Sequence, residues 1–324
     1  MTQVENGKAF EYSIAKNYFD HLISLNLKVE LVENNSLIIA KGFYDKATPV
    51  EKQRFDIAAK NTIETLLVIE PGLIAQNGEN DILKIHLATD SQGQIGDVRD
   101  IVFNRGKSKP QWEIGISAKN NHEAVKHSRL SPTINFGKDW FGHSCSDQYF
   151  AEINEVFHWI KNLMNENKAM TWNDLGIRKD NEVYLPILLA FRKELLQLSN
   201  LFNDVPCNLL SYLIGRKPFY KIIKDDKNNL VIVKAFNLGG ELNKTVARIK
   251  PRATTEKIKF PTRIIELEFK EGSNNTLMMI LDEGWQISFR IHNASLKLET
   301  SLKFDINLIG NPPILFTQHL FVLD

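Results

Sequence analysis

The chain has 324 residues, of which 43% are hydrophobic and 24% charged, a composition that excludes a disordered chain and indicates a folded globular protein. It carries 40 Lys and Arg against 39 Asp and Glu, which gives a net charge of +1. This balance excludes a protein that coats nucleic acid with a uniformly basic surface, but it does not exclude a local basic groove. No apolar run approaches the roughly 18 residues of a membrane helix, and the polar residues 1–9 argue against a signal peptide. Because two cysteines, Cys145 and Cys207, cannot form a disulfide framework, we expect a cytoplasmic protein.

The first 70 residues predict two long helices around a hairpin. Apolar residues recur at helical spacing over residues 8–25, which predicts the first helix. Alternating residues 28–32 and 37–40 predict the two strands of the hairpin. Thr48-Pro49-Val50-Glu51 combines an N-cap, a proline at the first helical position and a capping-box glutamate, so it predicts a helix that ends before Pro71.

The middle of the chain predicts a three-stranded meander followed by helices. The strands are expected over residues 82–88, 98–104 and 111–118, with turn residues between them. The helices are expected over residues 122–130, 147–165 and 184–200.

From Phe219 onward the hydrophobic pattern has period two, with turn clusters every eight to twelve residues. The expected strands are residues 219–223, 230–236, 264–269, 277–281, 285–291 and 302–308. We therefore predict an α/β (α+β) fold with a boundary near residue 210. Residues 1–210 would form an α/β domain, and residues 211–324 an antiparallel, β-rich region.

Two charged residues stand at strand ends that a hairpin would bring together. Asp100 lies at the start of the second strand of the meander, and Lys119 lies at the end of the third. A carboxylate that holds Mg²⁺ beside a lysine that shares the charge of a phosphate is a plausible site for phosphodiester hydrolysis. The alternative is a surface ion pair that flanks the hairpin. The sequence contains no Walker, dinucleotide-binding, C-x-x-C or G-x-S-x-G motif that would support another chemistry.

This arrangement resembles the core of the PD-(D/E)xK nucleases, in which an acid opens the second strand and a (D/E)xK triplet lies on the third. Asp100 matches the first acid, and Ser117-Ala118-Lys119 matches the triplet, with serine where an acid is usual. The resemblance therefore implies that a second metal-binding carboxylate comes from elsewhere. We expect Glu11, on the N-terminal helix, to supply it, and Asp97 to assist Asp100.

Three other glutamates are weaker candidates for this second acid. Glu113 shares a strand face with Ser117, but four residues of strand separate them by roughly 13 Å. Glu64 and Glu123 remain alternatives to Glu11.

Several longer segments are similar to the HaeIII family of type II restriction endonucleases. The longest is Ser117–Ser131, and its companions are Gly7–Tyr12, Asn135–Trp140, Trp285–Ser295 and Ser301–Asp305. This resemblance implies Mg²⁺-dependent cleavage of double-stranded DNA at GGCC, between G and C, which leaves blunt ends. It also implies a cognate DNA methyltransferase as companion, a nuclease domain in residues 1–210 and a DNA-recognition region in residues 211–324.

Basic residues near the expected site are candidates for DNA contacts. On a helix over residues 122–130, His122, Lys126 and Arg129 would share one face, with His127 beside them, and would form a cationic stripe suited to phosphates. The alternative is a solvated helix face.

Basic residues on the C-terminal strands are the second group of candidates. Arg263, Arg290 and His292 are expected there, and arginine is the natural bidentate reader of guanine in the major groove. Ordinary surface residues of a soluble sheet are the alternative.

Two competing functions stay open at this point. One is a PD-(D/E)xK nuclease with a different target. The other is a non-catalytic, sequence-specific DNA-binding protein on the same fold, because Ser117 replaces the usual acid. Magnesium-dependent cutting of any DNA would distinguish the enzyme from the binding protein.

Overall fold

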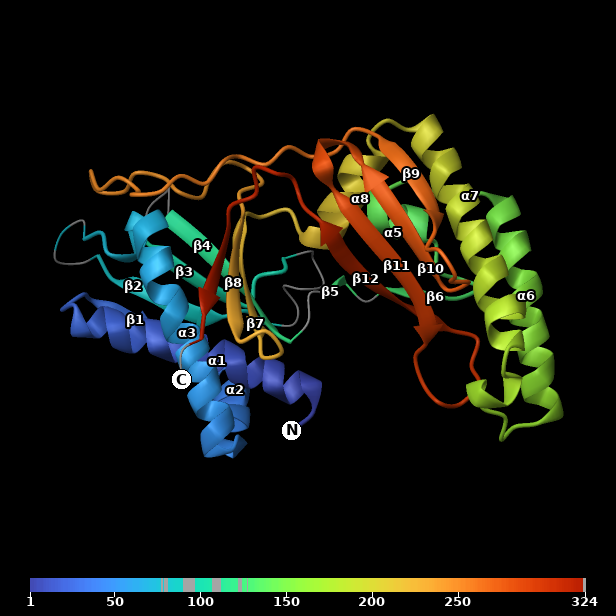
Figure 1. Ribbon diagram of the computed structural model, residues 1–324, viewed down its shortest axis with the longest axis horizontal. Coiled ribbons are helices and arrows are strands. Elements are labelled where there is room, and N and C mark those ends of the chain that lie inside the picture. Colours follow the sequence, from blue (N-terminus) through green and yellow to red (C-terminus); the bar gives the residue numbers. More distant parts are fainter. Residues whose placement is uncertain are drawn as a thin grey trace. The chain divides into compact units, whose positions relative to one another are not determined.

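The structure is a computed structural model that describes residues 1–76, 78, 81–89, 97–106, 112–121, 124–126 and 128–322. The chain forms two compact units, each with helices and one sheet (Figure 1). Unit 1 comprises Met1–Glu123, Gly215–Ile258 and Ile314–Asp324, and unit 2 comprises Ala124–Ile214 and Lys259–Pro313. Among the described residues, no helix is both long and apolar enough to cross a membrane.

Three helices of unit 1 begin at residues whose side chains cap them. They are α1 (Gln3–Ser24), α2 (Asn35–Lys46) and α3 (Pro49–Ile69), and the 3₁₀ turn η1 (Pro71–Leu73) follows α3. Thr48 and Glu51 form the predicted capping box of α3, with Pro49 at the first helical position. The predictions of α1 and α3 are therefore confirmed.

The predicted hairpin before α3 is wrong in its second half, because residues 35–46 form the helix α2. The Asn34 side chain accepts a hydrogen bond from the backbone N–H of Leu37 at 2.8 Å, so it caps a helix where a turn was expected. The first half is correct: residues 29–31 form a strand, which pairs with β2 in parallel.

The sheet of unit 1 has seven strands in the order β1-β2-β3-β4-β7-β8-β13. Their bounds are β1 (Val29–Leu31), β2 (Leu83–Leu87), β3 (Ile101–Arg105), β4 (Trp112–Asn120), β7 (Phe219–Asp225), β8 (Leu230–Phe236) and β13 (Thr317–Phe321). Strands β2, β3 and β4 form the predicted antiparallel meander, and β7 and β8 form a predicted hairpin. The edge strand β13 was not predicted.

Alternation along β4 separates the core of unit 1 from its candidate chemistry. Ile114, Ile116 and Ala118 belong to a buried apolar cluster that also contains residues of α1 and α3, such as Phe10. Successive side chains of a strand point to opposite faces, so Ser117 and Lys119 project from the face opposite that cluster.

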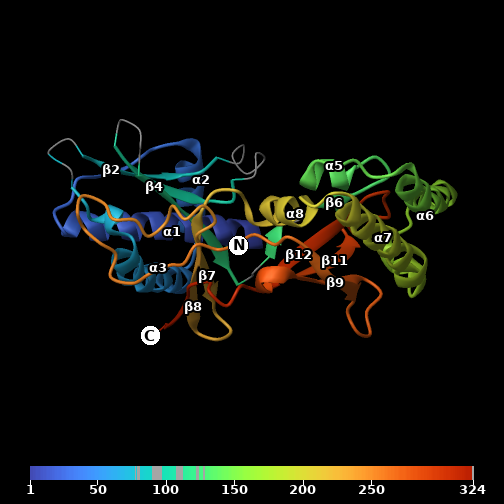
Figure 2. The ribbon, with the colours of Figure 1, turned by 90° about the horizontal axis from the view of Figure 1, so that it is seen from above.

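The described helices of unit 2 lie on one side of a second sheet, with α7 and α8 in contact with its strands (Figure 2). The helices are α5 (Phe136–Phe141), α6 (Asp147–Glu166), α7 (Leu185–Leu201) and α8 (Val205–Ile214), with short turns η2 (Trp172–Leu175), η3 (Lys179–Tyr184) and η4 (Asp282–Gly284). The sheet has the order β5-β12-β11-β10-β9, and β6 also pairs with β12. The strand bounds are β5 (Ala124–Lys126), β6 (Arg129–Leu130), β9 (Ile264–Phe269), β10 (Thr276–Leu281), β11 (Gln286–Asn293) and β12 (Leu302–Gly310).

The helix predicted over residues 122–130 is wrong, because the described residues of this segment form the strands β5 and β6. Both strands pair antiparallel with β12, so partners distant in sequence override the local helical spacing. The helices predicted over residues 147–165 and 184–200 are confirmed as α6 and α7.

The two units also differ from the single division predicted near residue 210. Strand β7 pairs in parallel with β4, which places the β7–β8 hairpin in the sheet of unit 1. Residues 124–130, in turn, pair with β12 and therefore belong to unit 2.

Candidate active site

Asp100 and Lys119 meet at one end of the β2–β3–β4 meander, as the hairpin pattern predicts. The Lys119 Nζ lies 3.5 Å from the Asp100 Oδ2, and both side chains are about one-fifth exposed (22% and 21%). The Asp100 Oδ2 also accepts hydrogen bonds from the backbone N–H of Ala118 at 2.7 Å and from the Ser117 hydroxyl at 3.2 Å. These contacts fix the carboxylate next to the ammonium while water or a ligand can still reach it.

Ser117 therefore has a defined part in the site, although it cannot supply the missing negative charge. Its hydroxyl donates to Asp100, and its residue is buried. At the position where the resemblance leads one to expect an acid, the chain has a side chain that donates to Asp100.

Glu11 is electrostatically linked to the Asp100–Lys119 pair. Its side chain is buried on α1, and the Lys8 Nζ donates a hydrogen bond to its Oε2 at 3.0 Å. Burial, followed by the negative charge of Asp100, raises the pKa of Glu11 to about 8, while Lys8 and Lys119 oppose this shift. Three residues predicted for catalysis, Glu11, Asp100 and Lys119, thus share one electrostatic environment.

The donor set of this cluster fits Mg²⁺. Among the residues that the structure describes, no three His, Cys, Asp or Glu side chains gather at a metal-binding distance. Mg²⁺ ordinarily takes only one or two protein carboxylates and completes its shell with water and substrate phosphates. Burial, and after it the charge of Asp100, raises the pKa of Glu11, and a small dication held there would relieve the repulsion between the two carboxylates.

The alternative second acids are placed differently. Glu64 is exposed on α3, and Glu123 lies outside the described residues. Glu113 accepts a hydrogen bond from the Arg99 Nη1 at 2.7 Å and is therefore engaged elsewhere.

Asp97 belongs to an ion-pair network around Arg99. The Arg99 Nε and Nη2 each donate to Asp97 at 2.8 Å, and the Lys217 Nζ lies 3.3 Å from its Oδ2. Burial opposes ionisation of Asp97, but the Arg99 guanidinium outweighs it and lowers the pKa of this carboxyl. The structure therefore pairs Asp97 with Arg99 and Lys217.

Gly115 on β4 makes room for Arg99, because a Cβ there would lie 2.0 Å from the Arg99 Cδ. Arg99 is nearly buried, and its pairs with Asp97 and Glu113 fasten the segment that precedes β3 onto β4. Sequence reasoning missed this role of Arg99, and the glycine in the interior of β4 was the available signal.

A second set of hydrogen bonds holds the residues that directly follow Lys119. The Asn121 Nδ2 donates to the Asp226 Oδ2 at 2.7 Å, and the Asp226 backbone N–H donates back to the Asn121 Oδ1 at 2.8 Å. Asn121 has a φ of 60°, a left-handed conformation that asparagine tolerates better than most residues. These bonds tie the end of β4 to the β7–β8 turn.

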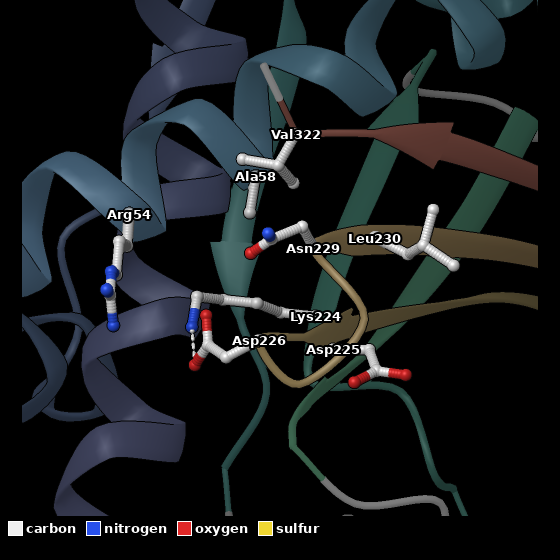
Figure 3. A pocket seen from close by; sticks show the side chains of 8 residues that line it. All are labelled: Arg54, Ala58, Lys224, Asp225, Asp226, Asn229, Leu230 and Val322. Atoms are coloured by element: carbon white, nitrogen blue, oxygen red, sulfur yellow. Dashed lines mark hydrogen bonds and ion pairs between the residues drawn. The ribbon is translucent and has the colours of Figure 1, made fainter. Parts of the chain in front are cut away.

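A pocket of about 210 Å³ lies beside this turn, and Figure 3 shows the side chains that line it. Lys224 points toward Asp226 there and pairs with it, and its Nζ also donates to the Asn120 Oδ1 at 3.3 Å. Because these contacts already engage the Lys224 ammonium at the end of β4, we assign the pocket no ligand.

Lys126, predicted for phosphate contact, lies on the helix-covered side of the sheet in unit 2. It stands opposite the buried Ile306 of β12, and its Nζ donates to the Tyr212 carbonyl at 3.1 Å and lies 3.4 Å from the centre of the Tyr212 ring. Burial lowers the pKa of Lys126 to about 8. These contacts give Lys126 a packing role against α8.

The other predicted DNA-binding residues that the structure describes in unit 2 lie at its surface. His122 and His127 lie outside the described residues. Arg290 is exposed on β11 and donates to the Asp305 Oδ2 at 2.9 Å, and His292 follows on the same strand face. Arg129 on β6 is exposed and donates to the Ser301 hydroxyl at 3.2 Å. Arg263, just before β9, is also exposed.

Comparisons with known proteins agree with the resemblance seen in the sequence. The family model described as HaeIII restriction endonuclease matches residues 7–312. The protein named Type II restriction enzyme HaeIII, from Haemophilus aegyptius, is 37% identical over 309 residues, which cover 95% of this chain and 94% of that protein. No solved structure matches.

Proposed function

The chain belongs to the HaeIII restriction endonuclease family, and from this membership we propose that it cleaves double-stranded DNA at GGCC with Mg²⁺, between G and C, leaving blunt ends. It is a type II restriction endonuclease, a site-specific deoxyribonuclease that acts on DNA. The observation that carries the chemistry is the Asp100–Lys119 pair beside the buried Glu11.

Each residue of this cluster has a defined part in the proposed reaction. Glu11 and Asp100 would hold Mg²⁺, which supplies charge neutralisation at the phosphate and a bound water of lowered pKa. Lys119, whose ammonium lies 3.5 Å from Asp100, would stabilise the negative charge that develops on the phosphate or would hold the attacking water. Ser117 and the backbone N–H of Ala118 keep Asp100 oriented.

We further propose that unit 1 is a PD-(D/E)xK core. Helix α1, the β2–β3–β4 meander, the acid before β3 and the lysine on β4 occur in the order that this core requires. A parallel strand, β7, then continues the sheet beside β4. Glu11 would supply the carboxylate that is absent at position 117, where this chain has serine.

The cellular setting of the proposal follows from the substrate. An enzyme that cuts DNA at a short site needs a cognate methyltransferase that protects the host's own sites, and we propose that both act in the cytoplasm. The two free cysteines, Cys145 and Cys207, support a reducing compartment.

Digestion of a plasmid of known sequence tests this function directly. With Mg²⁺ we expect fragments whose mapped ends fall between G and C of every GGCC, and no cutting in EDTA. A plasmid methylated at GGCC should resist. Defined ends at another sequence would reassign the target, and a failure to cut any DNA would favour a non-catalytic DNA-binding protein.

We expect Arg290→Ala to weaken binding to the target specifically. The side chain is exposed on β11, and its pair with Asp305 orients a guanidinium that could donate to the O6 and N7 of guanine. Its loss should cost about 1–3 kcal/mol on a GGCC duplex and little on a scrambled one. Binding titrations on both duplexes check this, and an equal loss on both would place Arg290 among the backbone contacts.

A further inference from the structure

The sheet of unit 2 has one face that its helices leave uncovered. Phe289 of β11 and Phe304 of β12 pack against Phe191 of α7 on the covered face. The alternate residues of the same strands point to the other face, which Figures 1 and 2 show without a helix in front of it within unit 2. Among them are Arg290 and His292 of β11 and Lys303 and Asp305 of β12.

Strand register lines up three basic residues across this open face. Arg129 of β6 stands directly opposite Lys303 of β12, and Lys303 stands directly opposite His292 of β11. Residues opposite one another on neighbouring strands have Cβ atoms about 5 Å apart, and like charges in such positions are destabilising. We call Arg129, Lys303 and His292 the cationic row.

Asp305, an acid on the same face, is already in an ion pair. Asp305 stands opposite Arg290, and the two side chains are joined at 2.9 Å. Arg129 and Lys303 are two positive charges in directly opposed positions, and an anionic ligand would relieve their mutual repulsion. The row crosses three strands and so extends about 10 Å. A DNA duplex carries one phosphate charge per roughly 1.7 Å of its axis, so a surface of this length faces several phosphates.

We propose that the cationic row binds the phosphate backbone of the DNA duplex, with Lys303 at its centre. This inference rests on the proposed function, because that function makes DNA the ligand of the protein. Arg290 lies two residues from His292 on the same face, about 7 Å along the strand. The row therefore sets the position of the duplex against which Arg290 reads a base, since phosphate contacts fix register and base contacts give specificity.

Binding measurements on Lys303→Gln test the proposal, with Lys161→Gln as a matched control. Lys161 is exposed on α6, among the helices of unit 2, so both variants lose one positive charge from the surface. Affinity is measured in EDTA, to prevent cleavage, on GGCC and scrambled duplexes at several salt concentrations. Lys303→Gln should weaken binding to both duplexes alike and lower the slope of log Kd against log salt by about 0.9, whereas Lys161→Gln should leave both unchanged. Lys303→Arg should restore the slope.

The proposal is overturned if Lys303→Gln and Lys161→Gln behave alike, or if Lys303→Gln loses affinity for GGCC alone. Cleavage by the wild-type enzyme separates this failure from a failure of the proposed function. If the wild type cuts plasmid DNA and the Lys303→Gln slope is unchanged, only the cationic row is withdrawn. If the wild type neither cuts nor binds DNA, the function itself is withdrawn.

Discussion

Asp100→Asn should lower the rate of DNA cleavage by about 100-fold or more, and Lys119→Ala should do the same. The asparagine keeps an oxygen that can accept from the backbone N–H of Ala118, so the fold is preserved while the negative charge is lost. The alanine removes the ammonium that lies 3.5 Å from Asp100. Both changes act on groups whose charge matters most when the phosphate reacts.

Single-turnover cleavage with Mg²⁺, paired with binding titrations on a GGCC duplex, measures this effect. We expect binding within a few-fold of wild type in both variants, because both residues belong to unit 1 and neither is part of the proposed DNA contacts of unit 2, the cationic row and Arg290. Wild-type cleavage rates in either variant would remove that residue from the catalytic cluster.

Asp97→Asn is the matched comparison for Asp100→Asn. Asp97 pairs with the nearly buried Arg99, so the variant should lower the melting temperature but retain Mg²⁺-dependent cleavage at a temperature where it is folded. A folded Asp97→Asn enzyme without cleavage would instead make Asp97 a metal ligand, as the sequence first suggested.

Glu11→Gln should abolish Mg²⁺-dependent cleavage and at the same time stabilise the fold at alkaline pH. The pKa of Glu11 is raised from about 4.5 to about 8 by burial and by Asp100. A group with a raised folded-state pKa contributes stability that is fully present below its unfolded pKa and is lost as pH rises through the folded pKa. In wild type this loss occurs between about pH 4.5 and 8, and glutamine, which has no charge, avoids it.

Denaturant unfolding in EDTA at a series of pH values measures the stability effect. The difference in unfolding free energy between Glu11→Gln and wild type should increase as pH rises from 5 to about 9, by a few kcal/mol at most. Adding Mg²⁺ at pH 8 should stabilise the wild type more than the variant, because only the wild type offers both carboxylates. This readout does not depend on activity.

Glu64→Gln is the control for this prediction, because Glu64 is exposed on α3 and should tolerate the change in both assays. If Glu64→Gln is inactive and Glu11→Gln cuts DNA normally, the second acid is Glu64 on α3, and our assignment of Glu11 on α1 is wrong.

The sequence by itself determined the elements whose signals are local. The side chains of Thr48 and Glu51 satisfy backbone N–H groups at the start of α3, and Pro49 suits the first helical position, so the four residues 48–51 sufficed to predict where the helix begins. The Asp100–Lys119 pair followed for the same reason, because consecutive antiparallel strands bring known ends together. Glu11 was chosen from the resemblance to the PD-(D/E)xK nucleases, and its catalytic role stays a prediction, although its side chain is buried and lies within the electrostatic influence of Asp100.

Only the tertiary structure decided the features that depend on distant partners. At helical spacing, Lys126 and Arg129 would share one face. Both segments instead pair with β12 and form strands, so Lys126 lies on the helix-covered face of the sheet and Arg129 on the open face. The cationic row exists only through that pairing, since Lys303 is distant in sequence from Arg129. Side chains of a strand alternate between faces, so which basic residues meet DNA is set by register with strands from elsewhere in the chain, and local spacing carries no information about that register.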